Sequence, residues 1–212
     1  MFDIEYKGGN CVVITTKKNQ LVIDAHREVF GLKDISVKDA TELATEKRFL
    51  TNSPEYRVSI EGPGEYEISD IAIKGVPAYR CLDDPATSPM DGNIYNVTID
   101  NIHVGVIGNV ADITDDQLEE AGLIDILIVP IGGNGYTLDY LAAIDLVRRI
   151  DPKVVIPVHY SDSSLKYEVP QDGVDTFINE LKVDVVEDKK LKIKSDTTLP
   201  LSLTVYKLAF DK

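Results

Sequence analysis

The residues of this chain best suited to chemistry are its three histidines, and one of them closes an apolar run. The segment VVIPVHYSD, residues 154–162, ends on His159 and Tyr160. Residues 154–156 predict a buried strand, and Pro157 is expected to stop the hydrogen-bonded ladder of that strand. His159 would then follow a strand end, where α/β proteins commonly place reactive groups. Its imidazole is a candidate metal ligand, provided that the rest of the sequence supplies partners.

Few other side chains offer such partners. His26 in IDAHRE and His103 near the turn in IDNIHV fit surface or structural positions, although His26 also follows a strand end and can approach the same site. Ser163-Ser164 comes after His159, but neither a nucleophile elbow nor an orienting acid accompanies it, so a serine hydrolase is not predicted. Several acidic residues could supply carboxylate ligands to a metal ion, but their spacing matches no recognised metal-binding loop. They are Asp24, Glu46, Glu65, Asp83, Asp84 and Asp112.

A second candidate feature is the glycine-rich loop Gly132-Gly133-Asn134-Gly135, which joins an apolar run to an amphipathic segment. A loop before a helix N-terminus favours anions, yet this one lacks the GxGxxG pattern and an acidic ribose partner. The turn and the helix cap account for its composition. We therefore predict a pocket wall or small-anion position here rather than a nucleotide site.

Composition excludes several classes of function. The net charge is −14, from 36 acidic and 22 basic residues, which repels phosphate backbones and argues against a nucleic-acid partner. The two cysteines, Cys11 and Cys81, form no CxxC motif and are expected to be free thiols. The first residues lack a signal-peptide pattern and no run of about 18 apolar residues occurs, so we expect a cytoplasmic protein that does not bind a membrane.

The elements around these residues fall into two halves. Residues 1–107 predict strands and turns, with a hairpin turned at 17–19, another at Asp100-Asn101, and a short helix over 38–47. After Gly108, strands alternate with helices: one in 114–121 with a capping box, one after a Thr137 cap, and one over 172–182. No linker or repeat divides the chain. The prediction is one domain, residues 1–212, of α/β (α+β) class with two sheets packed face to face and helices outside.

Three stretches carry a resemblance to a known family. They are GPGEYEISDIAIKGVPAYR (62–80), the segment from IYNVTIDNIHVGVIG to PIGGNGYTLD (94–139), and RRIDPKVVIPVHY (148–160). In order and spacing the chain resembles the metallo-β-lactamase superfamily, and within it the small Zn-dependent hydrolase-like branch that includes ascorbate-phosphate lactonase-type proteins. The resemblance implies an αββα four-layer sandwich with any active site at one edge between the sheets.

The resemblance also implies a set of metal-ligand positions, and this chain departs from nearly all of them. At the ligand positions of the family's THxHxDH segment, this sequence has Glu46, Arg48, Leu50 and Thr51. Val106 stands where the family has a histidine ahead of a Gly-Asp step, and Asn109 replaces the aspartate of that step. The histidine of the P-x-H-Y segment is His159. Only His159 keeps the family residue. One imidazole does not hold a catalytic zinc, because such a site needs at least three protein ligands.

The sequence therefore predicts a metallo-β-lactamase-fold protein without cofactor that serves as a binding or scaffold protein. Its partner would be a small ligand or another protein, with an oligomer compatible with the sequence. The alternative is an active hydrolase of a phosphoester, lactone or similar ester, in which His159, His26 and carboxylates hold one divalent metal, zinc. The residues expected to line a pocket beside the vestigial site are His26, Gly132, Gly133, Asn134 and Tyr160.

Overall fold

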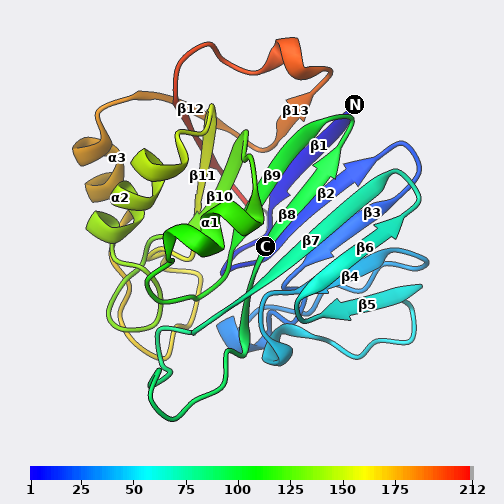
Figure 1. The fold of residues 1–212 in the computed structure, drawn as a ribbon, viewed down its shortest axis with the longest axis horizontal. Helices are drawn as coiled ribbons and strands as arrows, with labels where there is room; N and C mark the ends of the chain where they lie inside the picture. The colour runs from blue at the N-terminus through cyan, green and yellow to red at the C-terminus, as the bar shows by residue number, and fades with distance from the viewer. Residues whose placement is uncertain (211–212) are drawn as a thin grey trace.

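The computed structural model describes residues 1–210, whose strands form two sheets packed face to face (Figure 1). The first sheet has six strands in the order β13-β1-β2-β3-β4-β5. Its strands are β1 (Phe2–Tyr6), β2 (Val12–Thr16), β3 (Gln20–Ile23), β4 (Thr41–Ala44), β5 (Val58–Glu61) and β13 (Leu191–Ile193). The β1–β2–β3 part is antiparallel, as the predicted hairpin turn at 17–19 requires.

The second sheet has eight strands in the order β12-β14-β11-β10-β9-β8-β7-β6. Its members are β6 (Gly64–Ile68), β7 (Ile71–Ala78), β8 (Gly92–Ile99), β9 (Ile102–Ile107), β10 (Ile126–Pro130), β11 (Val154–Val158), β12 (Asp184–Asp188) and β14 (Thr204–Leu208). From β6 to β9 neighbouring strands are antiparallel, and from β9 to β14 they are parallel. The parallel half is where helices connect the strands, because a parallel pair needs a crossover.

Three α-helices lie against the eight-stranded sheet: α1 (Asp115–Ala121), α2 (Tyr140–Ile150) and α3 (Val174–Leu181). The α1 helix begins with the predicted capping box, in which Thr114 and Gln117 satisfy each other's backbone N–H groups. The outer face of the six-stranded sheet is covered by segments 32–40 and 51–57 instead. They bury a small cluster that includes Cys11, Val22 and Tyr56. The predicted two-sheet fold class is confirmed, with loops forming the layer outside the first sheet.

The main core fills the space between the sheets. β1 alternates buried and half-buried residues along its length, which sets one face toward the second sheet. β10 and β11 are buried at every position, as expected for parallel strands covered on both faces. Tyr95 links the two sheets, since its hydroxyl donates to the Ala44 carbonyl at 3.1 Å and accepts from the Gly62 N–H at 3.0 Å.

Three local predictions were wrong. The segment predicted as a helix over 38–47 contains strand β4, which pairs in parallel with β3 and β5, so tertiary pairing overrides its helical composition. The cap of α2 is Asp139, whose carboxylate accepts from Ala142 N at 2.8 Å, and not Thr137. Pro157 does not end β11, because it lies within the strand opposite Val129 of β10. Only the ladder to β14 stops before it, at Val155, as the missing N–H of a proline requires.

No helix within residues 1–210 has the length and apolar character needed to cross a membrane.

Candidate functional site

Buried polar side chains from four distant parts of the chain meet where the strands end. Asn10 lies in the turn between β1 and β2, Glu46 follows β4, Asn109 follows β9, and His159 follows β11. All four residues are between 1% and 4% exposed. Because polar groups are rarely buried without partners, their gathering at one place indicates a specific network rather than a packing accident.

The partners of His159 fix the protonation state of its ring. Its Nδ1 contacts the Asn10 Oδ1 atom, while Asn10 Nδ2 donates to Asn109 Oδ1 at 2.8 Å. Since the amide oxygen of Asn10 is an acceptor, His159 Nδ1 must carry the proton and donate it. Burial, and secondarily the positive charge of Arg48, lower the pKa of His159 to about 3. The imidazole is therefore neutral at physiological pH, and its Nε2 is an acceptor with no partner among the described residues.

Asp24, at the end of β3, extends the network to the adjoining strand. Its carboxylate accepts from the backbone N–H of Thr45 at 2.7 Å and from the Thr45 hydroxyl at 2.8 Å. Burial raises the pKa of Asp24 to about 7, while the two Thr45 hydrogen bonds and a contact with Asn10 oppose that rise. Asp24 therefore holds the start of the 45–51 segment in place and titrates near neutrality.

Glu46 and Arg48 face each other in an ion pair beside this network. The Nη2 of Arg48 donates to Glu46 Oε1 at 3.2 Å, and its Nε lies 3.0 Å from Oε2. Arg80, itself paired with Asp83, lies 3.8 Å from Glu46 Oε2. Burial raises the pKa of Glu46, and the two guanidinium groups oppose the rise. Arg48 also lies 4.7 Å from the ring centroid of Phe49 and 5.3 Å from that of Tyr136, so it is held by cation–π contacts as well.

Side chains nearly fill the space in front of His159. The remaining cavity is about 20 Å³, roughly the room one water molecule needs. Phe30 and Tyr167 pack on the imidazole with ring centroids 5.4 and 4.8 Å away. Arg48 and Gln171 line the same cavity, and Gln171 Oε1 is another buried acceptor without a partner in the described chain. The cleft at this edge of the sandwich is thus closed by aromatic and cationic side chains.

The structure separates the positions that align with family ligands into two groups. Glu46, Arg48, Asn109 and His159 lie at the site. Thr51 turns away, since its backbone N–H and its hydroxyl both donate to Glu42 at 2.7 Å. Leu50 packs against a small buried cluster that includes Phe30 and Phe49, and Val106 is buried in the main core.

The residues predicted to line a pocket are spread more widely. His26 is half-buried and pairs with Asp34, at 2.8 Å between Nδ1 and Oδ2, and no described contact joins it to His159. Gly132 lies against Gln171, Gly133 N donates to Thr137 Oγ1 at 2.8 Å, and the amide of Asn134 contacts the Gly132 carbonyl. Tyr160 packs on Tyr6 and lines a separate hollow beside α3.

A zinc ion does not fit the donors present. Within residues 1–210, no group of three or more His, Cys, Asp or Glu side chains is placed to hold a metal. The guanidinium of Arg48 occupies one implied ligand position and neutralises the carboxylate at another. Asn109 offers an amide that is already bonded to Asn10. The guanidinium of Arg48 therefore already supplies the positive charge that a metal ion would bring to this site.

Asn10 is the functional residue that sequence reasoning missed. Its role as the link between His159 and Asn109 depends on contacts across 149 and 99 residues of sequence. Gly8 and Gly9 have positive φ angles in this turn, and His159 N donates to Gly9 O at 2.8 Å. The signal in the sequence is a polar residue that follows two glycines and precedes the apolar run 11–14.

Comparison with known proteins places these features in a family context. Residues 3–159 match the family model of the β-lactamase superfamily domain. A UPF0173 metal-dependent hydrolase of Pyrococcus horikoshii is 31% identical over 100 residues, covering 46% of this chain and 44% of the relative. One from Pyrococcus abyssi is 29% identical over 163 residues, covering 74% of this chain and 69% of the relative. The chain thus spans about half the length of the first curated relatives it matches.

Solved structures share the same fold. A metallo-β-lactamase superfamily protein from Thermotoga maritima superposes with a TM-score of 0.78 at 21% identity, covering 99% of this chain and 100% of that one. A metallo-hydrolase from Ignicoccus hospitalis superposes with a TM-score of 0.63 at 14% identity, covering 97% and 95%. At these identities the likeness concerns the arrangement of strands and helices.

Proposed function

The chain belongs to the β-lactamase superfamily, and we propose that in this member a protein-only polar network has replaced the metal centre. On this proposal the protein does not carry out metal-dependent hydrolysis and acts as a binding or scaffold module. The superfamily membership predicted from the GPGEYE, PIGGNGYT and IDPKVVIPVHY segments is confirmed by the match over residues 3–159. The relatives named metal-dependent hydrolases define the activity from which this chain departs.

The observation that carries the proposal is the Arg48–Glu46 ion pair at two implied ligand positions. A guanidinium cannot lose its proton in a protein, so Arg48 can neither ligate a metal nor tolerate one close by. It also takes up the negative charge of Glu46, the carboxylate best placed to bind a cation. Because the pair is buried on the Glu46 side and braced by Phe49 and Tyr136, it is part of the folded structure.

One observation favours a second candidate, a hydrolase with an atypical single-metal site. The Nε2 lone pair of His159 is unpartnered, and a neutral imidazole held through Nδ1 is the form in which histidine binds metals. Such a site would require Arg48 to move away from Glu46, so that Glu46 and Asp24 could serve as carboxylate ligands. We rank this second because it must break the ion pair that the folded chain has formed.

Metal binding tests the two candidates directly. Untagged protein would be incubated with Zn²⁺, Mn²⁺ or Fe²⁺ and desalted, and bound metal would be quantified by mass spectrometry. We expect a stoichiometry near zero for the wild type and for His159→Ala alike. One tightly held metal per chain that disappears in His159→Ala would overturn the proposal and justify screening phosphoesters and lactones.

A second variant, Arg48→Met, tests the role of the ion pair, because it removes the guanidinium group and keeps Glu46 and His159. If the ion pair is what excludes metal, this variant should bind zinc measurably better than the wild type. Equal binding by the two proteins would show that Arg48 is not the excluding group.

A further inference from the structure

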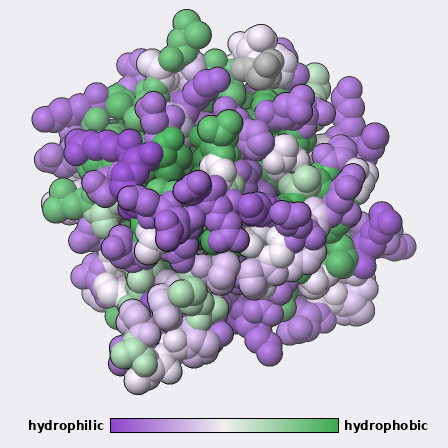
Figure 2. Space-filling model, viewed as in Figure 1, coloured by the Kyte–Doolittle hydropathy of each residue, from purple (hydrophilic) through white to green (hydrophobic). Residues whose placement is uncertain are grey.

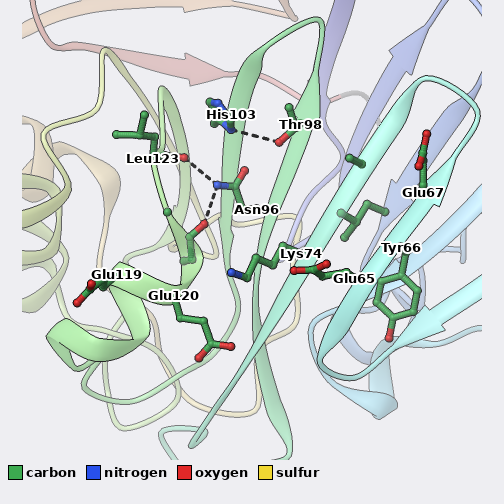
Figure 3. Close-up of a pocket in the computed structure, with 14 residues that line it drawn as sticks. Glu65, Tyr66, Glu67, Lys74, Asn96, Thr98, His103, Glu119, Glu120 and Leu123 are labelled. Carbon is green, nitrogen blue, oxygen red and sulfur yellow. Dashed lines mark hydrogen bonds between the residues drawn. The ribbon is translucent and has the colours of Figure 1, made fainter.

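The outer face of the eight-stranded sheet carries a groove that the closed site does not explain, and we propose that it binds a small linear polyamine. The groove has a volume of about 640 Å³ and runs between α1 and the β6–β7 hairpin (Figure 3). This volume falls within the range of about 300–1,000 Å³ found for small-molecule sites. The proposal is independent of the metal question, because the groove shares no lining residue with the His159 cavity.

Strand register shows that the groove floor is a built surface. The pairings Glu65–Lys74 and Lys74–Asn96 place these three side chains in one row across β6, β7 and β8. Glu67–Ala72, Ala72–Thr98 and Thr98–His103 form the next row, two residues along each strand. Positions two apart on a strand face the same side, so both rows point to the outer face of the sheet.

Asn96 is the buried polar anchor of this floor. It is 6% exposed, and its Nδ2 donates to the carbonyls of Ala121 and Leu123 at 2.8 and 2.7 Å, which closes the C-terminal end of α1. Both amide hydrogens are used in this way. Its Oδ1 is left as an acceptor with no partner in the described part of the chain. An unpaired buried acceptor among carboxylates calls for a ligand that brings N–H donors.

The charge of the groove selects the same chemistry. Glu65 and Glu67 from β6 and Glu119 and Glu120 from α1 line it, against Lys74 as its single ammonium group. In Figure 3, the side chains of Glu65 and Glu120 lie on opposite sides of Lys74, below Asn96. The C-terminal end of α1 adds the partial negative charge of its last carbonyls. The surrounding surface is also largely hydrophilic on this face (Figure 2).

The spacing of these groups favours a linear cation with several amines over a single ion. Neighbouring strands lie about 4.8 Å apart, so the β6 carboxylates and Asn96 on β8 are separated by roughly 10 Å. A linear triamine such as spermidine covers that length and places amines at both ends. The methyl group of Ala72 and the side chain of Leu123 also line the groove and offer apolar contacts to the carbon spacers. A metal ion is a poorer fit, because no set of carboxylates here is placed to ligate one.

Isothermal titration calorimetry with spermidine tests the inference at about 0.15 M salt, where long-range attraction is screened beyond about 8 Å. We expect saturable binding of one spermidine per chain. The double variant Glu65→Gln/Glu120→Gln should bind about fivefold or more weakly. Lys74→Gln should bind about threefold more tightly, because it removes the competing ammonium group. An anionic ligand would respond to Lys74→Gln in the opposite direction.

The matched control is Glu55→Gln/Glu180→Gln, which removes the same charge from exposed residues on other elements. Circular dichroism would establish that each variant is folded. If the control weakens spermidine binding as much as the groove variant does, the attraction is to the overall charge of −14 and the proposal is wrong. It is equally wrong if wild-type protein shows no saturable binding, or if Lys74→Gln binds more weakly.

Discussion

Removing one side of the Arg48–Glu46 ion pair should be far more costly than removing the other. The Glu46 side chain is 3% exposed, whereas that of Arg48 is 32% exposed. Arg48→Met leaves the buried Glu46 carboxylate without its main partner, and breaking a buried pair in this way typically lowers the free energy of unfolding by about 3–5 kcal/mol. Arg80 remains 3.8 Å from Glu46 and compensates in part, so we expect a loss of about 3 kcal/mol at pH 8. Glu46→Gln leaves a guanidinium that reaches water and should cost about 1 kcal/mol.

The pH dependence of this loss is the sharper test. Burial already raises the pKa of Glu46 in the folded protein, and the opposing effect of Arg48 disappears in Arg48→Met. A group whose pKa is raised on folding binds more protons in the folded state, so its contribution to stability falls as pH rises. The free energy lost in Arg48→Met should therefore be larger at pH 8 than at pH 5. In Arg48→Met/Glu46→Gln, which has no carboxylate, the loss should be small and independent of pH.

Urea unfolding of the four proteins, followed by far-UV circular dichroism at both pH values, gives the free energies of unfolding. The comparison requires an unchanged m value, because a changed one would signal a different denatured state. If Arg48→Met and Glu46→Gln are equally destabilising, or if the loss in Arg48→Met is the same at pH 5 and pH 8, the ion pair does not hold Glu46 and our reasoning about the closed site fails.

Other variants report on the network and the core. Asn10→Ala leaves His159 Nδ1 and Asn109 Oδ1 without partners, so urea unfolding should show a loss of about 2–5 kcal/mol; a loss below 1 kcal/mol would contradict the network. Asp24→Asn removes a carboxyl whose pKa rises from 3.8 to about 7 on folding, a group that destabilises the fold increasingly from pH 4 to pH 7. Its stability relative to wild type should therefore climb across that range, with about 4 kcal/mol as the upper bound, and a flat difference would contradict the raised pKa. Phe177→Ala in α3 should lower the free energy of unfolding by about 3–5 kcal/mol, since that ring is fully buried; a thermal melt near wild type would place α3 outside the core.

The second half of the fold was largely predictable because local signals and tertiary structure agree there. The Thr114–Gln117 capping box, the apolar run that became β10 and the apolar face of α3 each indicated the element that formed. Segment 38–47 was mispredicted because Thr41–Ala44 forms a strand only by pairing with β3 and β5, from elsewhere in the chain. Propensity cannot register a contact of that kind.

The site was predictable only in part, for a similar reason. Family positions named Glu46, Arg48, Asn109 and His159, which lie close together in the structure, yet nothing in the sequence showed that Arg48 would pair with Glu46. Position alone also suggested Thr51 and Val106, whose side chains turn to Glu42 and to the main core. Side-chain direction at a strand end depends on the local backbone, and that information was absent from the pattern.

The long sequence separation within the Asn10–His159 contact has a consequence for how the chain folds. These residues stand 149 positions apart, and Asn10 and Asn109 stand 99 apart, so their hydrogen bonds cannot form before the two sheets have docked. The chain loses the entropy of closing such long loops early in folding, whereas directional side-chain contacts form late. The network should then be absent from the folding transition state. The polar network would then slow unfolding only, so its loss would increase the rate of unfolding and leave the rate of folding almost unchanged.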